Sequence, residues 1–377
     1  MRILQLSNYY YPHIGGIEKI AQAISKSCAA EHDVEVVCFS SGNRDSEDRV
    51  DGVRIVRIGT QMKFASQQLS AHAYGIIKEE IRTFHPDCII IHYPNPFQEA
   101  ILLQLIPKST RLIVYWHTDI VKQRLGAKLF HGLTLRLLTR ADCVIATSPN
   151  YIEGSKYLLR FRDKCRVVPN CIDENALVLS ERASALATEL RQKYAGRTLC
   201  LCVGRQVPYK GLEYAVEALK HLNERYALVI IGSAGAATPG IRRSSDGMSN
   251  VELLGEADQE TLTAYLAACD IFCFPSIMKN EAFGIALAEG MYFGKPAVTF
   301  TIPGSGVNYV SLDGVTGIEV ENRNAERFAE AIRFLAEHPD TLAEYGENAR
   351  KRVEEFFLYE QFQTGIREVL NGLGERI

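Results

Sequence analysis

The stretch FCFPSIMKNEAFGIALAEGMYFGK, residues 272–295, decides the fold of this chain. An apolar strand over residues 270–274 ends at Pro275, and a polar loop that carries Glu281 follows it. A helix rich in small residues then begins near Phe283-Gly284, and Glu289 lies on it about two turns beyond the loop acid. A buried strand that passes through a loop into a helix is typical of α/β proteins.

The start of this helix has the features of an anion-binding site. Its first backbone N–H groups lack partners within the helix, and the positive end of the helix dipole lies there. Phe283, Gly284 and Ile285 could present those N–H groups, and Gly284 would let a ligand approach the backbone. A sugar nucleotide offers hydroxyls for the acid Glu281 and phosphates for the amides. The alternative is that Glu281 and Glu289 are solvated acids, since acids are common at helix starts.

Length and composition indicate a globular protein with two domains. The chain has 377 residues, of which 47% are hydrophobic and 23% charged, enough for two cores. No apolar run reaches the length of a membrane span, and a strand follows Met1-Arg2 directly, so we expect a cytoplasmic protein without a signal peptide. Ten cysteines occur without a C-x-x-C pair, which favours buried reduced thiols over zinc or redox use.

The net charge of −3 argues against general nucleic-acid binding. The charge is unevenly distributed, because residues 1–170 hold 22 Lys and Arg against 16 Asp and Glu, whereas the remainder holds 20 against 29. We therefore expect the first half to face an anionic partner.

Two successive runs of strands and helices predict two doubly wound domains. Strands such as CIIIHY at 88–93 and LIVYWH at 112–117 are apolar without polar alternation, which is typical of buried parallel strands. The first run has a helix over 68–84 and ends with a strand VVPNC at 167–171. After a helical connector over 173–196, the pattern restarts with LCLCVG at 199–204.

Ligands of open α/β sheets bind at the carboxyl ends of the strands, so the loops that follow the strands are candidate sites. After the first strand, Gly15 and Gly16 precede Glu18 at a helix start, where the bare backbone could wrap around a phosphate. The alternative is a plain turn with Glu18 as an N-terminal helix acid. No G-x-G-x-x-G fingerprint occurs here.

Four motifs resemble those of retaining GT-B glycosyltransferases of the family-4 type. They are G-G-x-E at 15–18, H-T-D at 117–119, G-R-x4-K-G at 204–211 and E-x7-E at 281–289. PNCID at 169–173 resembles the family's linker, with Cys171 in place of a glycine; if that glycine has positive φ, the turn must differ here. The resemblance covers nearly the whole chain.

This resemblance implies an α/β fold of GT-B architecture, in which two Rossmann-like doubly wound parallel-sheet domains face each other across a cleft. Residues 1–172 would form the acceptor-side domain, and residues 173–355 the nucleotide-sugar donor domain. A helix over 356–377 would cross back to the first domain.

The resemblance also implies a reaction, the transfer of a hexose from a nucleotide-diphosphate sugar with retention at the anomeric carbon. Arg205 and Lys210 would stabilise the leaving diphosphate, because it gains negative charge as the glycosidic bond breaks. His117 would orient the sugar from the first domain, although a lone histidine is more often structural. His92 has a similar position, and there we expect a packing role.

The remaining roles that the resemblance implies concern donor binding. Glu281 would bind sugar hydroxyls and Glu289 the ribose hydroxyls, assisted by the amides of Gly15–Gly16 and of residues 283–285. No D-x-D motif is present. Two cations and a helix dipole can replace a metal ion, so we expect no metal and no cofactor.

The donor is suggested by the segments HTDIVKQ at 117–123, NEAFGIALAEGM at 280–291 and GSGVNYV at 304–310. They resemble bacterial O-antigen or capsule glycosyltransferases, several of them mannosyltransferases. This favours GDP-mannose as the donor and a glycan or lipid-linked acceptor.

Segment Val121–Ala141 holds five cations and no acid, with apolar residues at helical spacing. A basic amphipathic helix could dock on the anionic inner leaflet of a membrane. It could equally be a crossover helix that packs on its own sheet.

Two hypotheses from other classes stay open, namely an epimerase or phosphorylase with the same fold and a non-catalytic subunit. A sugar-nucleotide epimerase would release a sugar or isomer without an acceptor, and a phosphorylase would bring pyridoxal phosphate and a longer chain. A non-catalytic subunit would keep the fold and lose the chemistry; Glu281, Arg205, Lys210 and His117 argue against it.

Overall fold

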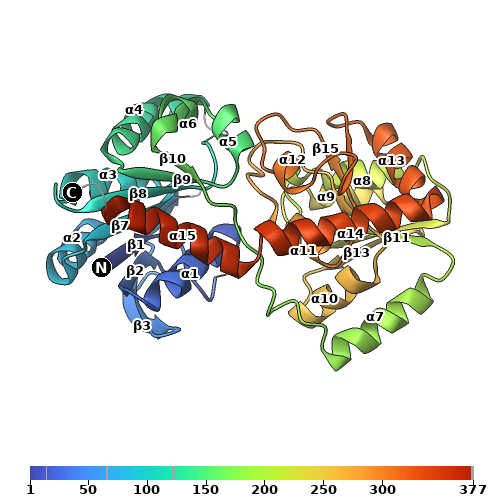
Figure 1. Cartoon of the computed structure of the whole chain (residues 1–377), viewed down its shortest axis with the longest axis horizontal. Helices are drawn as coiled ribbons and strands as arrows, with labels where there is room; N and C mark the ends of the chain where they lie inside the picture. Colours follow the sequence, from blue (N-terminus) through green and yellow to red (C-terminus); the bar gives the residue numbers. More distant parts are fainter. Residues whose placement is uncertain (14, 65–66, 121–123, 375–377) are drawn as a thin grey trace. The chain divides into compact units, whose positions relative to one another are not determined.

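The computed structural model describes the whole chain except residues 14, 65–66, 121–123 and 375–377, and the side chains of residues 64 and 124–129. The chain forms two compact units (Figure 1). Unit 1 comprises Met1–Asn170 and Glu360–Ile377, and unit 2 comprises Cys171–Tyr359. The division falls two residues before the predicted first boundary and four residues after the predicted second one.

Unit 1 is built on an eight-stranded sheet in the order β10-β9-β8-β7-β1-β2-β4-β3. All neighbouring strands are parallel except β3 and β4. The strand order reverses at β1, which pairs with β2 on one side and β7 on the other. The strands are β1 (Arg2–Leu6), β2 (Asp33–Phe39), β3 (Ser46–Val50), β4 (Val53–Ile58), β7 (Cys88–Tyr93), β8 (Arg111–Trp116), β9 (Cys143–Ala146) and β10 (Cys165–Val167).

Helices cover this sheet, and several begin at polar caps. Asn95 accepts a hydrogen bond from the Gln98 N–H at the start of α3, and Ser148 accepts one from the Tyr151 N–H at the start of α5. A hairpin of β5 (Met62–Phe64) and β6 (Gln67–Leu69) lies outside the large sheet. The helices are α1 (Gly16–Ala29), α2 (Ala73–Phe84), α3 (Pro96–Leu105), α4 (Arg124–Arg140), α5 (Pro149–Gly154), α6 (Lys156–Arg160) and α15 (Tyr359–Gly374).

Two sequence predictions in unit 1 are wrong in detail. The helix expected from residue 68 begins at Ala73, because residues 67–69 form the second strand of the hairpin. The last strand of the unit covers Cys165–Val167 and has ended before the predicted VVPNC segment is complete.

The linker residue Cys171 does not have positive φ, which among the described non-glycine residues occurs only at Asp51, His85 and Arg323.

Unit 2 contains six parallel strands in the order β13-β12-β11-β14-β15-β16. Here the order reverses at β11, which pairs with β12 and β14. Ligands of doubly wound sheets bind at such a reversal, beyond the carboxyl ends of the strands. The strands are β11 (Thr198–Val203), β12 (Tyr226–Ile231), β13 (Val251–Gly255), β14 (Ile271–Phe274), β15 (Ala297–Phe300) and β16 (Gly317–Val320).

The core of unit 2 is formed by these strands and the apolar faces of its helices. Phe272, Phe274 and Phe300 are among the largest fully enclosed side chains. The helices are α7 (Glu181–Lys193), α8 (Leu212–Leu219), α9 (Thr238–Ser244), α10 (Gln259–Ala268), α11 (Ile285–Tyr292), α12 (Val307–Val310), α13 (Ala325–Glu337) and α14 (Pro339–Phe356).

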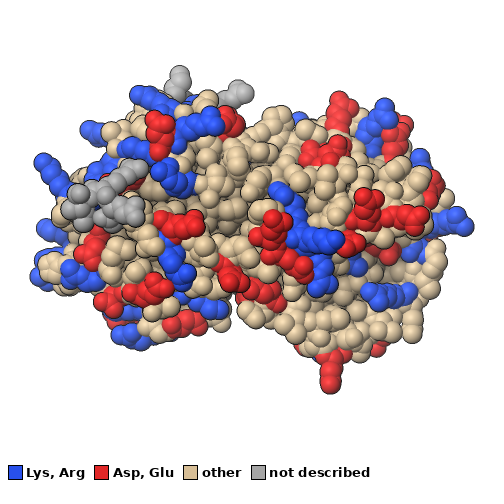
Figure 2. Space-filling model, viewed as in Figure 1, with Lys and Arg blue, Asp and Glu red and all other residues tan. Residues whose placement is uncertain are grey.

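All ten cysteines are buried and none is joined to another in a disulfide, as the sequence predicts. Within the described residues, no helix is long and apolar enough to cross a membrane. On the face drawn in Figure 2, acidic side chains lie between basic ones on both units. The excess of cations in the first half therefore does not form an uninterrupted basic surface on that face.

Candidate active site

Two residues from separate motifs meet at the carboxyl edge of the unit 2 sheet. Lys210 Nζ lies 2.5 Å from Glu281 Oε2, and the two side chains are 13% and 12% exposed. Lys210 ends a 3-10 turn (Pro208–Lys210) that follows β11, and Glu281 lies in the loop that follows β14. Since β11 and β14 are neighbours where the strand order reverses, the ion pair lies where this fold binds ligands.

The backbone around Lys210 leaves little freedom. Gly211 has φ +61°, and a Cβ atom there would lie 2.1 Å from the Pro275 carbonyl oxygen. The Ile277 N–H donates to the Tyr209 carbonyl at 2.9 Å, which joins the two loops. The Lys210 ammonium also lies 4.8 Å from the centre of the Phe274 ring, within reach of a cation–π interaction. Lys210 is therefore fixed in position by its surroundings.

Glu281 is held through one of its two carboxylate oxygens. The Ser276 hydroxyl donates to Oε2 at 3.1 Å, the same oxygen that contacts Lys210. The Ser305 hydroxyl donates to the Glu281 carbonyl oxygen at 2.5 Å. Among the described residues no partner reaches Oε1, which leaves that oxygen available to accept from a ligand hydroxyl.

The predicted anion-binding turn lies directly after Glu281. Gly284 has φ +94° and caps α11, so the helix begins at Ile285, directly after the predicted start near Phe283-Gly284. A Cβ atom at Gly284 would lie 3.1 Å from the Phe274 ring. The first backbone N–H groups of α11 have no acceptor within the helix. These groups lie next to Glu281, and their binding of an anion stays a prediction.

The structure buries Glu289, which is 6% exposed on α11. This excludes the alternative in which Glu289 is a solvated helix-surface acid. A buried carboxylate needs polar partners, because transfer of the charge from water is costly.

Arg205 follows β11 in the loop that also carries Lys210. Its side chain is exposed, and in the part of the chain that the structure describes it has no hydrogen bond or ion pair. The two predicted cations thus differ in their partners: the Lys210 ammonium forms an ion pair with Glu281, whereas the Arg205 guanidinium can bind an anion.

Gln206, the residue after Arg205, was not predicted as part of the site. Gln206 is 3% exposed, and its Nε2 donates to the Gly232 carbonyl at 3.2 Å. Its backbone N–H donates to Ser233, and its carbonyl accepts from Ala237. Gln206 therefore fixes the loop after β11 to the loop after β12. Its position inside the G-R-x4-K-G motif was visible in the sequence, but nothing marked it as buried.

In unit 1, His117 directly follows β8 and contacts a second histidine. His117 Nε2 lies 2.7 Å from Nδ1 of His92 on β7, and the rings stack with centroids 5.0 Å apart. The two side chains are 7% and 2% exposed. The packing role predicted for His92 is correct as far as burial goes, but the hydrogen bond to His117 was not foreseen.

Burial keeps both imidazoles neutral. Desolvation lowers the pKa of His92 to about 3. The pKa of His117 lies well below its usual value, mainly because of burial and also because of the neighbouring His92. A neutral imidazole can donate through one nitrogen and accept through the other.

The Gly15–Gly16 turn begins α1. Gly15 caps this helix in extended conformation, without a side-chain hydrogen bond to the cap. A Cβ atom at Gly15 would lie 2.2 Å from a carboxylate oxygen of Glu18, so the acid of this motif folds back over the turn. The turn follows β1, at the reversal of strand order in the unit 1 sheet.

No group of three or more His, Cys, Asp or Glu residues in the described part of the chain could hold a metal ion.

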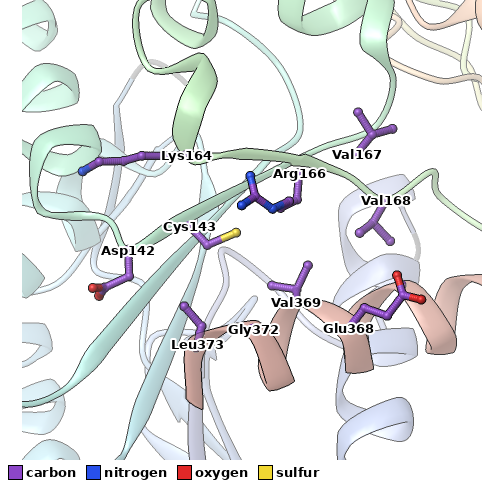
Figure 3. Close-up of a pocket in the computed structure, with 11 residues that line it drawn as sticks. Asp142, Cys143, Lys164, Arg166, Val167, Val168, Glu368, Val369, Gly372 and Leu373 are labelled. Atoms are coloured by element: carbon purple, nitrogen blue, oxygen red, sulfur yellow. The ribbon is translucent and has the colours of Figure 1, made fainter. Parts of the chain in front are cut away.

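The pocket drawn in Figure 3 lies elsewhere in unit 1, between strand β10, the start of β9 and helix α15. It contains none of the predicted site residues. Lys164 extends away from the labelled residues of α15, and its ammonium donates to the carbonyls of Leu138, Thr139 and Ala141. The Lys164 ammonium therefore caps the carboxyl-terminal end of α4 and is not available to a ligand.

The basic segment Val121–Ala141 is partly outside the described residues, which exclude 121–123. Its described helix is α4, where Leu137 and Leu138 are fully buried within unit 1. This end of the helix packs as a crossover helix does. Membrane docking stays a prediction.

Comparison with known proteins identifies the family. A model of Glycosyltransferase Family 4 matches residues 14–176, and one of Glycosyl transferases group 1 matches residues 188–352. The chain is 31% identical to the O-antigen chain mannosyltransferase C of Escherichia coli, over 95% of this chain and 94% of the relative. It is also 31% identical to the D-rhamnosyltransferase WbpZ of Pseudomonas aeruginosa, over 95% of this chain and 92% of the relative.

Solved structures share the fold along the whole chain. Sucrose-phosphate synthase from Thermosynechococcus elongatus aligns with a TM-score of 0.81 at 19% identity and covers 100% of both chains. Anabaena HepE in complex with UDP and glucose aligns with a TM-score of 0.79 at 18% identity, over 98% of this chain and 99% of that one. The chain therefore belongs to the group 1, family 4 glycosyltransferases and has their GT-B fold.

Proposed function

We propose that this glycosyltransferase moves a hexose from a nucleotide-diphosphate sugar to a glycan or lipid-linked acceptor during synthesis of a cell-surface polysaccharide. Mannose from GDP-mannose is the first candidate, because the E. coli relative is named as an O-antigen chain mannosyltransferase. A D-rhamnosyl donor is the second candidate, because the Pseudomonas relative has the same identity and a rhamnosyltransferase name. The observation that carries the proposal is the Lys210–Glu281 pair beside the start of α11.

The donor diphosphate would bind the two cations and the helix start of unit 2. The Arg205 side chain has no competing partner in the described part of the chain, and Lys210 is oriented by Glu281 and Phe274. Fixed positive groups stabilise the charge that develops on the leaving diphosphate. The N–H groups at 283–285, and those at Gly15–Gly16, would add donors to the phosphates.

The sugar would be held by Glu281 and His117, and the ribose by Glu289. Oε1 of Glu281 is the carboxylate oxygen that no described residue contacts, which fits a hydroxyl donor. A neutral His117 can exchange a hydrogen bond with a sugar oxygen without adding charge. The side chain of Glu289 is buried, and its carboxylate has two oxygens that suit a pair of hydroxyl donors.

The reaction would proceed with retention and without a metal ion. The bond between the anomeric carbon and the phosphate oxygen breaks, and a bond to the acceptor oxygen forms on the same face. The acceptor proton moves to the leaving phosphate oxygen, and the nucleoside diphosphate departs. Two cations and a helix dipole supply the positive charge that a metal would otherwise provide. The acceptor would be reached from the cytoplasm, at the inner leaflet if the Val121–Ala141 segment docks there.

The experiment is a thermal-shift panel with GDP-mannose, other GDP-hexoses, UDP-glucose, UDP-galactose and UDP-N-acetylglucosamine in excess EDTA. A ligand that binds only the folded state raises the melting temperature by mass action. Selective stabilisation by the sugars of one base supports the donor site, and Glu281→Gln should reduce it. If no donor stabilises the protein, or only after a divalent metal is added, the donor assignment fails. Acceptor-free conversion of the sugar would indicate an epimerase instead.

A further inference from the structure

The strand register brings His92 and His117 together at the carboxyl edge of the unit 1 sheet. His92 on β7 lies opposite Tyr115 on the parallel strand β8. Because side chains two residues apart share a face, His117 is the diagonal neighbour of His92 on the same face. The contact, 2.7 Å between His92 Nδ1 and His117 Nε2, is thus a consequence of the register.

Tyr115 completes the packing of this pair. Its ring lies 5.7 Å from that of His92 and 4.7 Å from that of His117. The Tyr115 hydroxyl donates to Asn170 Oδ1 at 2.8 Å, and all four side chains are buried. The orientation of His117 is therefore restricted by a ring stack as well as by the hydrogen bond from its neighbour.

The surroundings of the four ring nitrogens decide where the protons lie. Only one of the two central nitrogens can carry a proton, since the other must accept. His92 Nε2 is completely enclosed, and none of the described residues forms a hydrogen bond with it. If His117 donated to His92, that enclosed Nε2 would be an N–H group without an acceptor, which is rarer in folded proteins than an unsatisfied acceptor. The cheaper arrangement has the proton on His92 Nδ1, donated to His117 Nε2.

We propose that His92 is a positioning residue, which holds His117 in the tautomer that is protonated at Nδ1. His117 then offers a single N–H donor at Nδ1, the nitrogen that does not contact His92. Such a donor selects an oxygen acceptor on the ligand, a hydroxyl or ring oxygen. The inference rests on the proposed function, in which His117 contacts the transferred sugar, and it adds the residue that fixes the direction of that hydrogen bond.

The test uses two substitutions at the same position. His92→Asn can place an amide N–H near the position of His92 Nδ1 and keep the donation to His117. His92→Leu fills the site without a polar atom. His72→Asn serves as the control, because His72 is an exposed histidine of the same unit with an ion pair to Asp45. Urea melts followed by the single tryptophan, the buried Trp116 of unit 1, establish that each variant is folded.

The first readout is the tautomer of His117 in long-range ¹H–¹⁵N spectra of the full chain at neutral pH. The chain has nine histidines, and the His117 signals are those lost in His117→Gln. We expect Nδ1 protonation in the wild type and in His92→Asn, and a change toward Nε2 protonation in His92→Leu. Nε2 protonation of His117 in the wild type would overturn the inference. This readout needs no substrate, so it decides the inference even if no sugar donor is ever found.

The second readout is steady-state transfer with the donor that the thermal-shift panel selects. We expect kcat of His92→Leu to fall about tenfold, the cost of one misdirected hydrogen bond, with little change in KM. His92→Asn should recover to within about threefold of the wild type, and His72→Asn should match it. Equal kcat values for folded His92→Leu and His92→Asn would contradict a positioning role. Failure of the wild type to transfer any sugar would count against the proposed function and leave the tautomer result to stand alone.

Discussion

The ion pair between Lys210 and Glu281 gives the most quantitative prediction. Two unit charges 2.5 Å apart attract by about 1.7 kcal/mol in bulk water and about 6.6 kcal/mol at an effective dielectric constant of about 20. The side chains are only 13% and 12% exposed, so desolvation offsets much of the larger figure. We therefore expect a coupling free energy of about 1–3 kcal/mol.

A double-mutant cycle of Lys210→Met and Glu281→Gln measures this coupling. Each single variant leaves a buried charge without its partner, so the two single losses should sum to more than the loss in the double variant. Trp116 reports only on unit 1, so the assay is hydrogen exchange of peptides from β11 and β14 in unit 2. Losses that add within about 0.5 kcal/mol would refute the pairing.

The matched control is the pair Lys220–Glu217 on the surface of the same unit. Its distance is 2.9 Å, but the side chains are 45% and 41% exposed. Exposed pairs of this kind contribute about 0.3–0.5 kcal/mol. If the control cycle gives a coupling as large as that of Lys210 and Glu281, the burial argument is wrong.

Three further predictions concern stability. Burial raises the pKa of Glu99 to about 8, so the folded state binds this proton more tightly than the unfolded state does. The free energy of unfolding of unit 1 should therefore fall by up to about 1.4 kcal/mol per pH unit as the pH rises from about 4.5 to about 8. Glu99→Gln should flatten this loss in Trp116-monitored urea melts, and an unchanged slope would contradict it. The pKa values of His92 and His117 are lowered in the folded state. Their contribution to the free energy of unfolding is therefore present above about pH 6.5 and is lost as the pH falls below it, and His92→Leu should make this acid loss smaller in the same melts. Gly211→Ala should lower the free energy of unfolding of unit 2 by more than about 1 kcal/mol beyond the effect of Gly247→Ala, as measured by hydrogen exchange. Both glycines have positive φ, but of the two only Gly211 faces a backbone oxygen, so equal effects would refute the predicted clash.

The sequence predicted the parts of the fold that depend on buried apolar strands. The strands around CIIIHY and LCLCVG, and the helix that carries Glu289, are present. Strand β3, SEDRV, was not predicted because it is an exposed antiparallel edge strand with no apolar pattern. The helix predicted near Phe283-Gly284 begins at Ile285, because the left-handed backbone of Gly284 must first turn the chain.

The candidate site was predictable only where residues share a motif. The loops that hold Lys210 and Glu281 could be located from the strands before them, but their contact depends on the pairing of β11 with β14. The hydrogen bond between His92 and His117 likewise depends on strand register, which single residues do not reveal. Gln206 and the burial of Glu289 depend on packing across several elements.

The central claim is that this chain transfers a sugar through Lys210 and Glu281 without a metal ion. The most direct measurement is release of nucleoside diphosphate from GDP-mannose or another donor in EDTA, with and without a saccharide or lipid-linked acceptor. We predict acceptor-dependent release by the wild type and a loss of about 100–1,000-fold in kcat/KM for Lys210→Met, the cost of one oriented group at a developing charge. Release that needs a divalent metal, or that survives Lys210→Met unchanged, would contradict it.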